Sequence, residues 1–451
     1  MKSICTGVLT LLVYMALASP LAWADTPATS DDTDRQCSGE PCAAVFRGLV
    51  AFFDRDLRGL DGNGRSCADC HMITEQFRLT PSAAEARFQR LQKRRQYNQQ
   101  ADDPLFRPID ADDFRVNGEQ ATDYSNLRQN GLIRVVLALP ANIRLIEPAS
   151  NAPSDERTVD IWRMVPGVTD VKLTGSDGLN PWPRAPNQTG GFQLDGRFLT
   201  LQEQALGALL SHAQIRNQPQ PRLLDDLSSF QRVLFTNERV RALSAAIDRG
   251  AMPLPDVDPR LNALEQQGKL VFARSCGQCH GGPGQSTAQA PVVRMHDIFT
   301  QCPRPIDTRP ADVVSPPRFN FAACPPRLAR NARTYEITKP DGSTIRRTSS
   351  DPGRALLTGV AVPAVPTVRD DWNKLDVPGL RGLRHTAPYF HNNSADTLEA
   401  VVDHYIEFFK QIRVVAPPGV VPPAASTDGV NFDRQPKPEE RAALLAYLRK
   451  L

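Results

Sequence analysis

After its first 24 residues the sequence has no long apolar run, which excludes a membrane-spanning helix from the rest of the chain. It also has little excess charge of either sign, since 53 Lys and Arg residues are balanced by 50 Asp and Glu residues. No basic cluster stands out, so we expect no nucleic-acid partner. Histidine and methionine are scarce, with 7 and 6 residues in 451, and this limits which side chains could serve as metal ligands.

The N-terminus has the pattern of a secretory signal. Lys2 is the only charge before Asp25, and the apolar run 8–18 is too short to span a bilayer. Ala22 and Ala24 place small residues at the two positions that a signal peptidase reads. We therefore expect residues 1–24 to be removed, with a retained anchor as the alternative. The mature chain is then expected to be a soluble periplasmic protein with no integral membrane segment.

Cysteine carries the strongest functional signal. Of 9 cysteines, Cys5 leaves with the signal, and four others lie in two copies of C-x-x-C-H, the attachment signature of haem c. Two thiols on one turn reach the two haem vinyl groups, and the next histidine points at the iron. A thioredoxin-like pair and half of a zinc site are the alternatives, but neither explains a histidine after both pairs. The residues are Cys67, Cys70 and His71, then Cys276, Cys279 and His280.

The other four cysteines are expected to form structural disulfides. Proximity in sequence pairs Cys37 with Cys42 and Cys302 with Cys324. An oxidising compartment would allow both bonds. We assign neither pair a further role.

The fold expected is mainly α, with two cytochrome c-type domains, long loops and a small β-hairpin insertion. Helical apolar spacing precedes each haem motif, and a closing helix is expected at the C-terminus. Pro-rich stretches, including 140–190, predict long ordered loops. The domains are 25–254, with an insertion at about 135–190, and 255–451, with an insertion at about 295–370. The expected helices are 43–54, 199–212, 223–247, 261–273 and 439–451, and the hairpin is 336–348.

Two further segments narrow the interpretation of the haem motifs. They are 195–197 (D-G-R) with 201–207, and 377–391 (which ends T-A-P-Y-F-H) with 397–398. Together with the two haem motifs in this order, they resemble the bacterial dihaem cytochrome c peroxidase/MauG superfamily. The match consists of scattered blocks, and 135–190 and 295–370 have no counterpart.

The resemblance implies different roles for the two haems. Peroxide reacts at the N-terminal haem, while the C-terminal haem is six-coordinate and relays electrons. Its distal ligand lies fourteen residues after His391, at Tyr405, which is the MauG-like choice where the peroxidases have methionine. A phenolate ligand lowers the haem potential. Tyr405 also fits an ordinary amphipathic helix stripe, and Met295 and His296 are rival ligands.

The first haem is expected to be five-coordinate and high-spin. No histidine occurs between His71 and His212, and Met72 adjoins the proximal ligand. The resemblance places a glutamine and, ten residues later, a glutamate over this iron; the positions here are Gln204 and Gln214. Because an amide cannot carry the proton, His212 is the candidate replacement, although a surface or core role suits it equally. Where the family has a tryptophan directly before D-G-R, this chain has Leu194.

The resemblance also implies a calcium ion between the haems. Thr386 and Pro388 match positions whose carbonyls hold it, and Asn130 is a candidate third ligand. Three arginines are candidate partners of haem propionates, with solvated side chains as the alternative. They are Arg197, Arg381 and Arg384.

The leading hypothesis is therefore a peroxidase-type oxidoreductase. It reduces hydrogen peroxide at the first haem and takes electrons, through the second, from a small cytochrome c, a cupredoxin or an oxidisable protein substrate. The alternatives are a dihaem electron carrier, which needs two six-coordinate irons, and a dihaem oxygenase for an apolar substrate. The cofactors expected are two haem c groups and one calcium ion.

Overall fold

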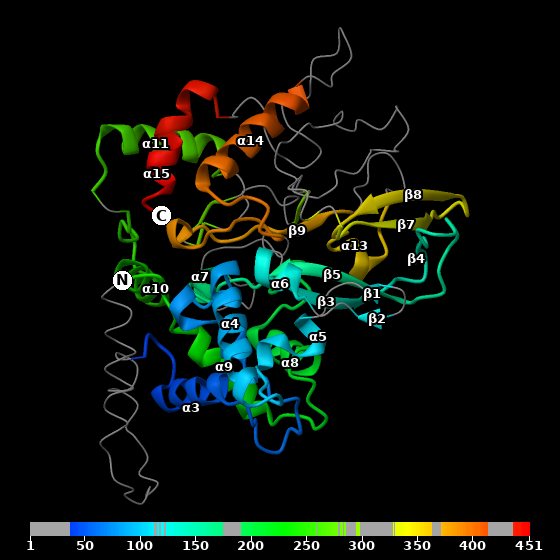
Figure 1. The fold of residues 1–451 in the computed structure, drawn as a ribbon. Helices are drawn as coiled ribbons and strands as arrows, with labels where there is room; N and C mark the ends of the chain where they lie inside the picture. Colours follow the sequence, from blue (N-terminus) through cyan, green and yellow to red (C-terminus); the bar gives the residue numbers. More distant parts are fainter. Residues whose placement is uncertain are drawn as a thin grey trace, which may run out of the picture.

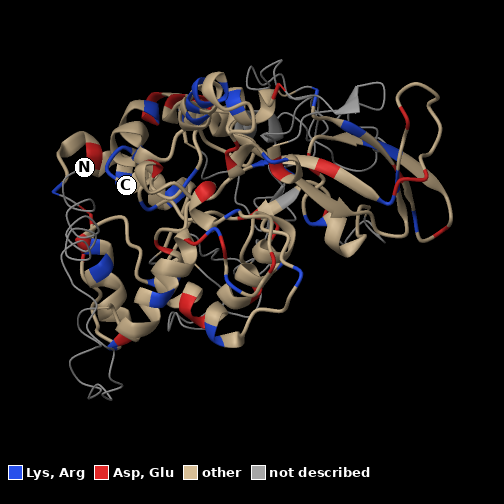
Figure 2. Ribbon diagram, turned by 60° about the horizontal axis from the view of Figure 1, so that its bottom comes forward, with Lys and Arg blue, Asp and Glu red and all other residues tan. Residues whose placement is uncertain are grey.

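The computed structural model describes residues 37–111, 115–116, 119–120, 123–174, 191–258, 260–277, 280–282, 284–285, 295–297, 328, 330–362, 371–413 and 436–451. The expected signal segment, Cys279 and the expected Cys302–Cys324 bond lie outside these residues. Within the described chain, no helix is both long and apolar enough to cross a membrane. Lys and Arg are interspersed with Asp and Glu along the ribbon (Figure 2), in keeping with the nearly neutral net charge.

Two helix pairs repeat one arrangement, and the first helix of each pair leads into a C-x-x-C-H motif. The first pair is α3 (Cys42–Phe53) packed on α9 (Pro221–Arg232), and the second is α11 (Ala263–Ser275) packed on α15 (Arg441–Leu448). Figure 1 shows one pair above the other. A Cβ added at Gly48 would lie 1.9 Å from the carbonyl oxygen of Asp226, and one at Gly268 would lie 1.9 Å from that of Ala443. Because glycine has no side chain, the backbones of the two helices can touch where each pair crosses.

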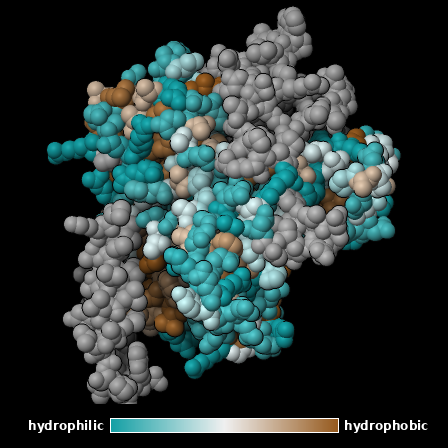
Figure 3. Space-filling view, in the orientation of Figure 1, coloured by the Kyte–Doolittle hydropathy of each residue, from teal (hydrophilic) through white to brown (hydrophobic). Residues whose placement is uncertain are grey.

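The outer face of α3 is apolar. Phe46, Val50 and Phe53 are 41%, 59% and 42% exposed, and Figure 3 shows apolar side chains gathered over this region. The opposite face of α3 contributes Phe52 to the core, where it packs with Phe77 and Phe230.

The helix expected over 223–247 is two helices, so this prediction is wrong. α9 ends at Arg232 and α10 (Glu238–Asp248) begins after Asn237. The Asn237 side chain accepts hydrogen bonds from the backbone N–H groups of Arg239 and Val240. An asparagine that caps these orphan donors starts a new helix rather than continuing an old one.

The other expected helices form close to their predicted bounds. α8 (Leu201–Ser211) packs on α9, and α14 (Leu398–Arg413) packs on α15. The remaining helical elements are η1 (Cys67–Asp69), η2 (Ile73–Glu75), α4 (Pro81–Tyr97), η3 (Pro104–Phe106), α5 (Pro108–Ala111), α6 (Ser125–Asn130), α7 (Val171–Thr174), α13 (Ala355–Thr358), η4 (Leu383–His385) and η6 (Pro438–Glu440).

The expectation of loops alone over 140–190 is also wrong, because part of this stretch forms strands. β3 (Leu132–Ala138) pairs antiparallel with β5 (Thr158–Met164), and β4 (Ile143–Leu145) pairs with β7 (Arg333–Thr338). β7 also pairs with β8 (Thr344–Ser349) around Asp341 and Gly342, where the sequence predicts a hairpin turn. Two further small sheets join β1 (Arg115–Val116) to β2 (Glu119–Gln120) and β6 (Met295–Asp297) to β9 (Lys374–Asp376).

The two insertions build one unit. Ile143 of the first faces Ile337 of the second across the β4–β7 pair, and both are fully buried. Tyr335 and Trp372 meet edge to face in the same core, with ring centroids 5.5 Å apart. This unit lies beside the helix pairs (Figure 1) and ties together segments that the sequence assigns to different halves.

Candidate haem-binding site

The first C-x-x-C-H motif lies on a short turn held by buried charges. Ser66 and Asp69 form a capping box at the start of η1. Asp69 also accepts from Arg55 and Arg87, and although burial alone would raise its pKa, these partners lower it. The carboxylate therefore stays charged and fixes the turn that carries both cysteines.

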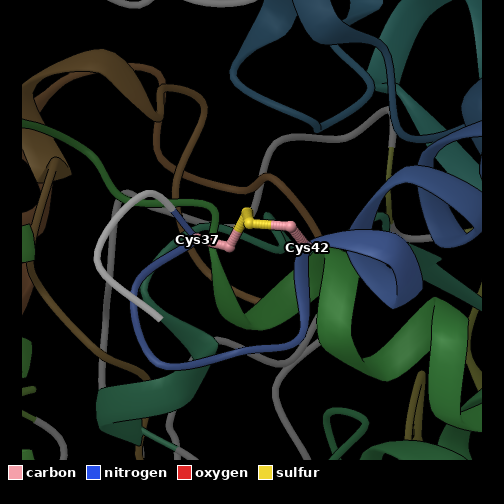
Figure 4. Close-up of a disulfide and its surroundings, with 2 residues drawn as sticks. All are labelled: Cys37 and Cys42. Carbon is pink, nitrogen blue, oxygen red and sulfur yellow. A yellow bond between two sulfur atoms is a disulfide. The ribbon is translucent and has the colours of Figure 1, made fainter. Parts of the chain in front are cut away.

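The thiols of this motif are available for attachment. Cys67 and Cys70 are not joined to one another or to any other described cysteine, whereas Cys37 and Cys42 form the expected disulfide (Figure 4). Burial raises the pKa of both Cys67 and Cys70 to about 12, which keeps the unreacted thiols protonated. Neither thiol of this motif is therefore used by a disulfide among the described residues.

His71 is oriented as a metal ligand. Its Nδ1 lies 3.0 Å from the carbonyl oxygen of Phe77, which makes Nδ1 the donor and leaves the Nε2 lone pair for a metal. Burial lowers the pKa of His71 to about 4, so the ring is neutral at pH 7. The ring lies beside Phe52, with centroids 6.1 Å apart.

The second motif repeats this geometry. Cys276 caps the C-terminus of α11, and the Nδ1 of His280 lies 3.1 Å from the carbonyl oxygens of both Gln285 and Pro378. Burial again lowers the histidine pKa, which favours the neutral ring. Two histidines, far apart in sequence, thus present the same tautomer.

One cavity of about 910 Å³ opens onto both motifs. This volume is near the upper end of the roughly 300–1,000 Å³ of typical ligand pockets. Its lining includes Cys67, Cys70 and His71 from the first motif, Cys276 and His280 from the second, and Gln204, His212, Gln214 and Tyr405. The structure therefore brings most of the residues singled out in the sequence to one space.

His212 is held toward the first motif by a buried carboxylate. It caps the C-terminus of α8, and its Nδ1 lies 2.8 Å from Oδ1 of Asp110. Asp110 in turn pairs with Arg65 at 2.6 Å, and both side chains are at most 3% exposed. Asp110 and Arg65 were missed in the sequence, because nothing local links Asp110 to a histidine 102 residues away.

The two glutamines differ in their surroundings. Gln204 lies on α8, is half-buried and lines the cavity. Gln214 also reaches the cavity but is exposed, with a φ of +50°, and its side-chain oxygen accepts from Asn63 at 3.1 Å. Leu194, which stands where the resemblance implies tryptophan, lines the cavity and accepts a backbone hydrogen bond from Asp376 of β9.

Tyr405 faces the cavity from α14. It is half-buried, and its ring lies 6.3 Å from that of Phe390 and 5.5 Å from that of His404. His404 is buried but is not among the cavity-lining residues. The side chains of the rival ligands Met295 and His296 lie outside the described part of the structure.

The residues expected to hold calcium have other partners. The Pro388 carbonyl accepts a hydrogen bond from Nη2 of Arg78 at 2.9 Å. The Asn130 carbonyl accepts from Nδ2 of Asn393 at 2.8 Å, and the Thr386 hydroxyl donates to the Leu383 carbonyl. The guanidinium of Arg78 places a positive charge beside the Pro388 carbonyl, and like-charge repulsion opposes a calcium ion at the same oxygen.

The arginines considered for haem propionates bind groups of this chain. Arg197 makes a bidentate pair with Asp195, and Arg381 lies 3.4 Å from Asp258. Arg384 donates to Nε2 of His385.

A further buried arginine, Arg163, connects the D-G-R segment to the second insertion. It bridges Asp195 and Asp351, and all three side chains are at most 4% exposed. Burial opposes ionisation of Asp195, but Arg163 and Arg197 lower its pKa to about 2.

Comparison with known proteins finds matches among solved structures. No protein-family model and no curated protein matches the chain. A MauG-like protein associated with microbial copper homeostasis is 16% identical, with 96% of this chain and 95% of that chain covered and a TM-score of 0.41. The diheme peroxidase BthA from Burkholderia thailandensis is 16% identical, with coverages of 91% and 86% and a TM-score of 0.40. Hydrazine synthase from Kuenenia stuttgartiensis is 15% identical, with coverages of 96% and 99% and a TM-score of 0.37.

These matches include the two kinds of protein that the motifs resemble, MauG-like proteins and diheme peroxidases. At such low identities and TM-scores, they assign no residue role and no activity to this chain.

Proposed function

We propose that this chain is a periplasmic dihaem c-type oxidoreductase of the peroxidase/MauG kind, built from two cytochrome c-type domains at 25–254 and 255–451. The observation that carries the proposal is the repeated geometry of His71 and His280, which present the same neutral tautomer to one cavity. A haem c held by each C-x-x-C-H motif would supply an iron there, the first for reaction with hydrogen peroxide and the second for electron relay.

His212 is the acid–base residue of the first site in this proposal. The Nδ1–H of His212 donates a hydrogen bond to Asp110, so Nε2 would be left to take a proton from one peroxide oxygen and return it to the other. Arg65 holds Asp110 in place through an ion pair of 2.6 Å. Gln204 would orient the peroxide by hydrogen bonding. Gln214 also lines the cavity, but it is exposed and takes no part in the proposed proton transfer.

Tyr405 and His280 are the residues that would hold the iron of the second haem in this proposal, with Tyr405 as its distal ligand. Its position on the cavity wall supports this role. Electrons come from a small cytochrome c, a cupredoxin or a protein side chain, and a MauG-like ligand favours the protein substrate.

The test uses the fully oxidised protein with both haems attached. We expect one high-spin and one low-spin signal in the EPR spectrum and a rapid optical change on addition of hydrogen peroxide. His212→Gln should slow this change by about 10²–10⁴-fold, the usual contribution of a general acid–base group. His385→Gln is the control, since His385 is exposed and does not line the cavity. Two low-spin haems whose optical spectrum does not change on addition of peroxide would instead identify an electron carrier.

A second candidate function is a dihaem oxygenase for an apolar substrate. The observation that favours it is the contribution of the first insertion to the cavity wall, through Val135 of β3 and Met164 of β5. Such an enzyme would consume oxygen in the presence of an apolar substrate without added peroxide. No oxygen uptake across a panel of apolar substrates would remove this candidate.

A further inference from the structure

Arg78 lies between the two haem motifs. It follows Phe77, whose carbonyl orients His71, and its own carbonyl accepts from the backbone N–H of Met72 at 3.1 Å. Its Nη2 donates to the carbonyl of Pro388 at 2.9 Å, in the T-A-P-Y-F-H block of the second half. The side chain is 3% exposed and lines the cavity, so a buried cation bridges the loops of the two proposed haem sites.

The charge of Arg78 lacks a carboxylate partner within the described chain, unlike those of the other arginines that line this cavity. Each of the others has an aspartate within salt-bridge distance. The six pairs are Arg65 with Asp110, Arg134 with Asp160, Arg163 with both Asp195 and Asp351, Arg197 with Asp195, and Arg381 with Asp258.

Arg78 also keeps one donor group unused. Its Nη1 is buried and has no hydrogen-bond partner among the described residues. Burial lowers the pKa of Arg78 to about 10, so the guanidinium remains charged at pH 7. A buried, uncompensated guanidinium is strongly unfavourable, and a polar cavity ligand with a negative charge would remove that cost.

We propose that Arg78 is the fixed cation between the two haems, in the place where the resemblance implies calcium, and that its Nη1 binds a haem propionate. This inference rests on the proposed attachment of haem at both motifs. The Pro388 carbonyl, which would face calcium, faces the guanidinium, and the Asn130 carbonyl faces the amide of Asn393. The chain thus supplies from its own sequence the positive charge that a bound ion would otherwise bring.

The first test is the metal content of the oxidised wild-type protein with both haems attached. We expect well under one calcium ion per chain, and no change in the EPR spectrum or thermal unfolding when EGTA is added and then replaced by excess calcium. One tightly held calcium ion whose removal alters the spectrum would overturn the inference. Haem content, measured separately, reports on the proposed function, and this test needs no peroxide.

The second test is the reduction potential of each haem in Arg78→Gln, with Arg78→Lys and Arg134→Gln alongside. Loss of a positive charge beside a propionate favours the oxidised haem, so Arg78→Gln should lower at least one potential while Arg78→Lys restores most of it. Arg134→Gln is the matched control, because that arginine lines the same cavity but pairs with Asp160. Potentials in Arg78→Gln equal to those in Arg134→Gln would overturn the propionate contact. If Arg78→Gln fails to fold, the Lys variant decides: potentials as in wild type support the contact, and potentials shifted downward refute a role for the charge.

Discussion

Replacing Asp351 by alanine should destabilise the protein more than the loss of any surface ion pair. Asp351 lies in the second insertion and binds Arg163 of β5 through two hydrogen bonds of 2.6 and 2.9 Å. Arg163 also reaches Asp195, 2.6 Å away, and Asp195 binds Arg197. Two arginines and two aspartates thus make a neutral cluster in which Arg163, Asp195 and Asp351 are at most 4% exposed.

The expected magnitude follows from the charge that would be left behind. Removing Asp351 gives the cluster a net charge of +1 and leaves two N–H groups of Arg163 without an acceptor. Removing one partner of a buried ion pair lowers the free energy of unfolding by about 3–5 kcal/mol. For a chain of this size, we expect this to lower the midpoint of thermal unfolding by roughly 3–6 °C.

The assay is chemical and thermal unfolding of the haem-loaded protein, followed by circular dichroism. Asp155→Ala provides the control, because Asp155 is a fully exposed aspartate of the first insertion and lies 3.4 Å from Arg144. We expect no measurable change in stability for that variant. If Asp351→Ala unfolded at the same denaturant concentration as Asp155→Ala, the buried cluster would not be acting as a coupled set of charges, and the reasoning would fail.

Three further predictions concern the site. Tyr405→Phe should convert the low-spin EPR signal of the second haem to a high-spin one, and an unchanged signal would assign the ligand elsewhere. Cys67→Ser with Cys70→Ser should halve the covalently bound haem measured after acid extraction, whereas two haems per chain would refute attachment at the first motif. Asp195 has a folded-state pKa of about 2 against an unfolded value of about 3.9, so its stabilisation is complete above pH 4 and lost as the pH falls toward 2. It amounts to about 2–3 kcal/mol, and Asp195→Asn should flatten acid unfolding in this window.

Local signals in the sequence predicted local structure well. The spacing of apolar residues before each C-x-x-C-H motif predicted α3 and α11, and proximity predicted the Cys37–Cys42 bond. The N-cap residue Asn237 is also a local signal, and it predicts a helix start within the single helix expected over 223–247.

Long-range contacts were outside the reach of such signals. β4 finds its partner in β7, and Arg163 finds Asp351 at a separation of 188 residues. His212 could be singled out as a candidate, but the carboxylate that orients it could not. Each of these contacts depends on which surfaces meet after folding, and a single sequence does not record that pairing.

The sheet of β4, β7 and β8 joins strands from both halves of the chain and therefore affects how each half folds. A chain released after residue 254 would have β4 without its hydrogen-bonded neighbour and Ile143 and Leu145 without most of their apolar cover. The two halves are therefore not independent, because this sheet and its core can form only after the second half has been synthesised. Exchanging one half for that of another dihaem protein would break this sheet, so the halves can be expected to have changed together rather than been shuffled.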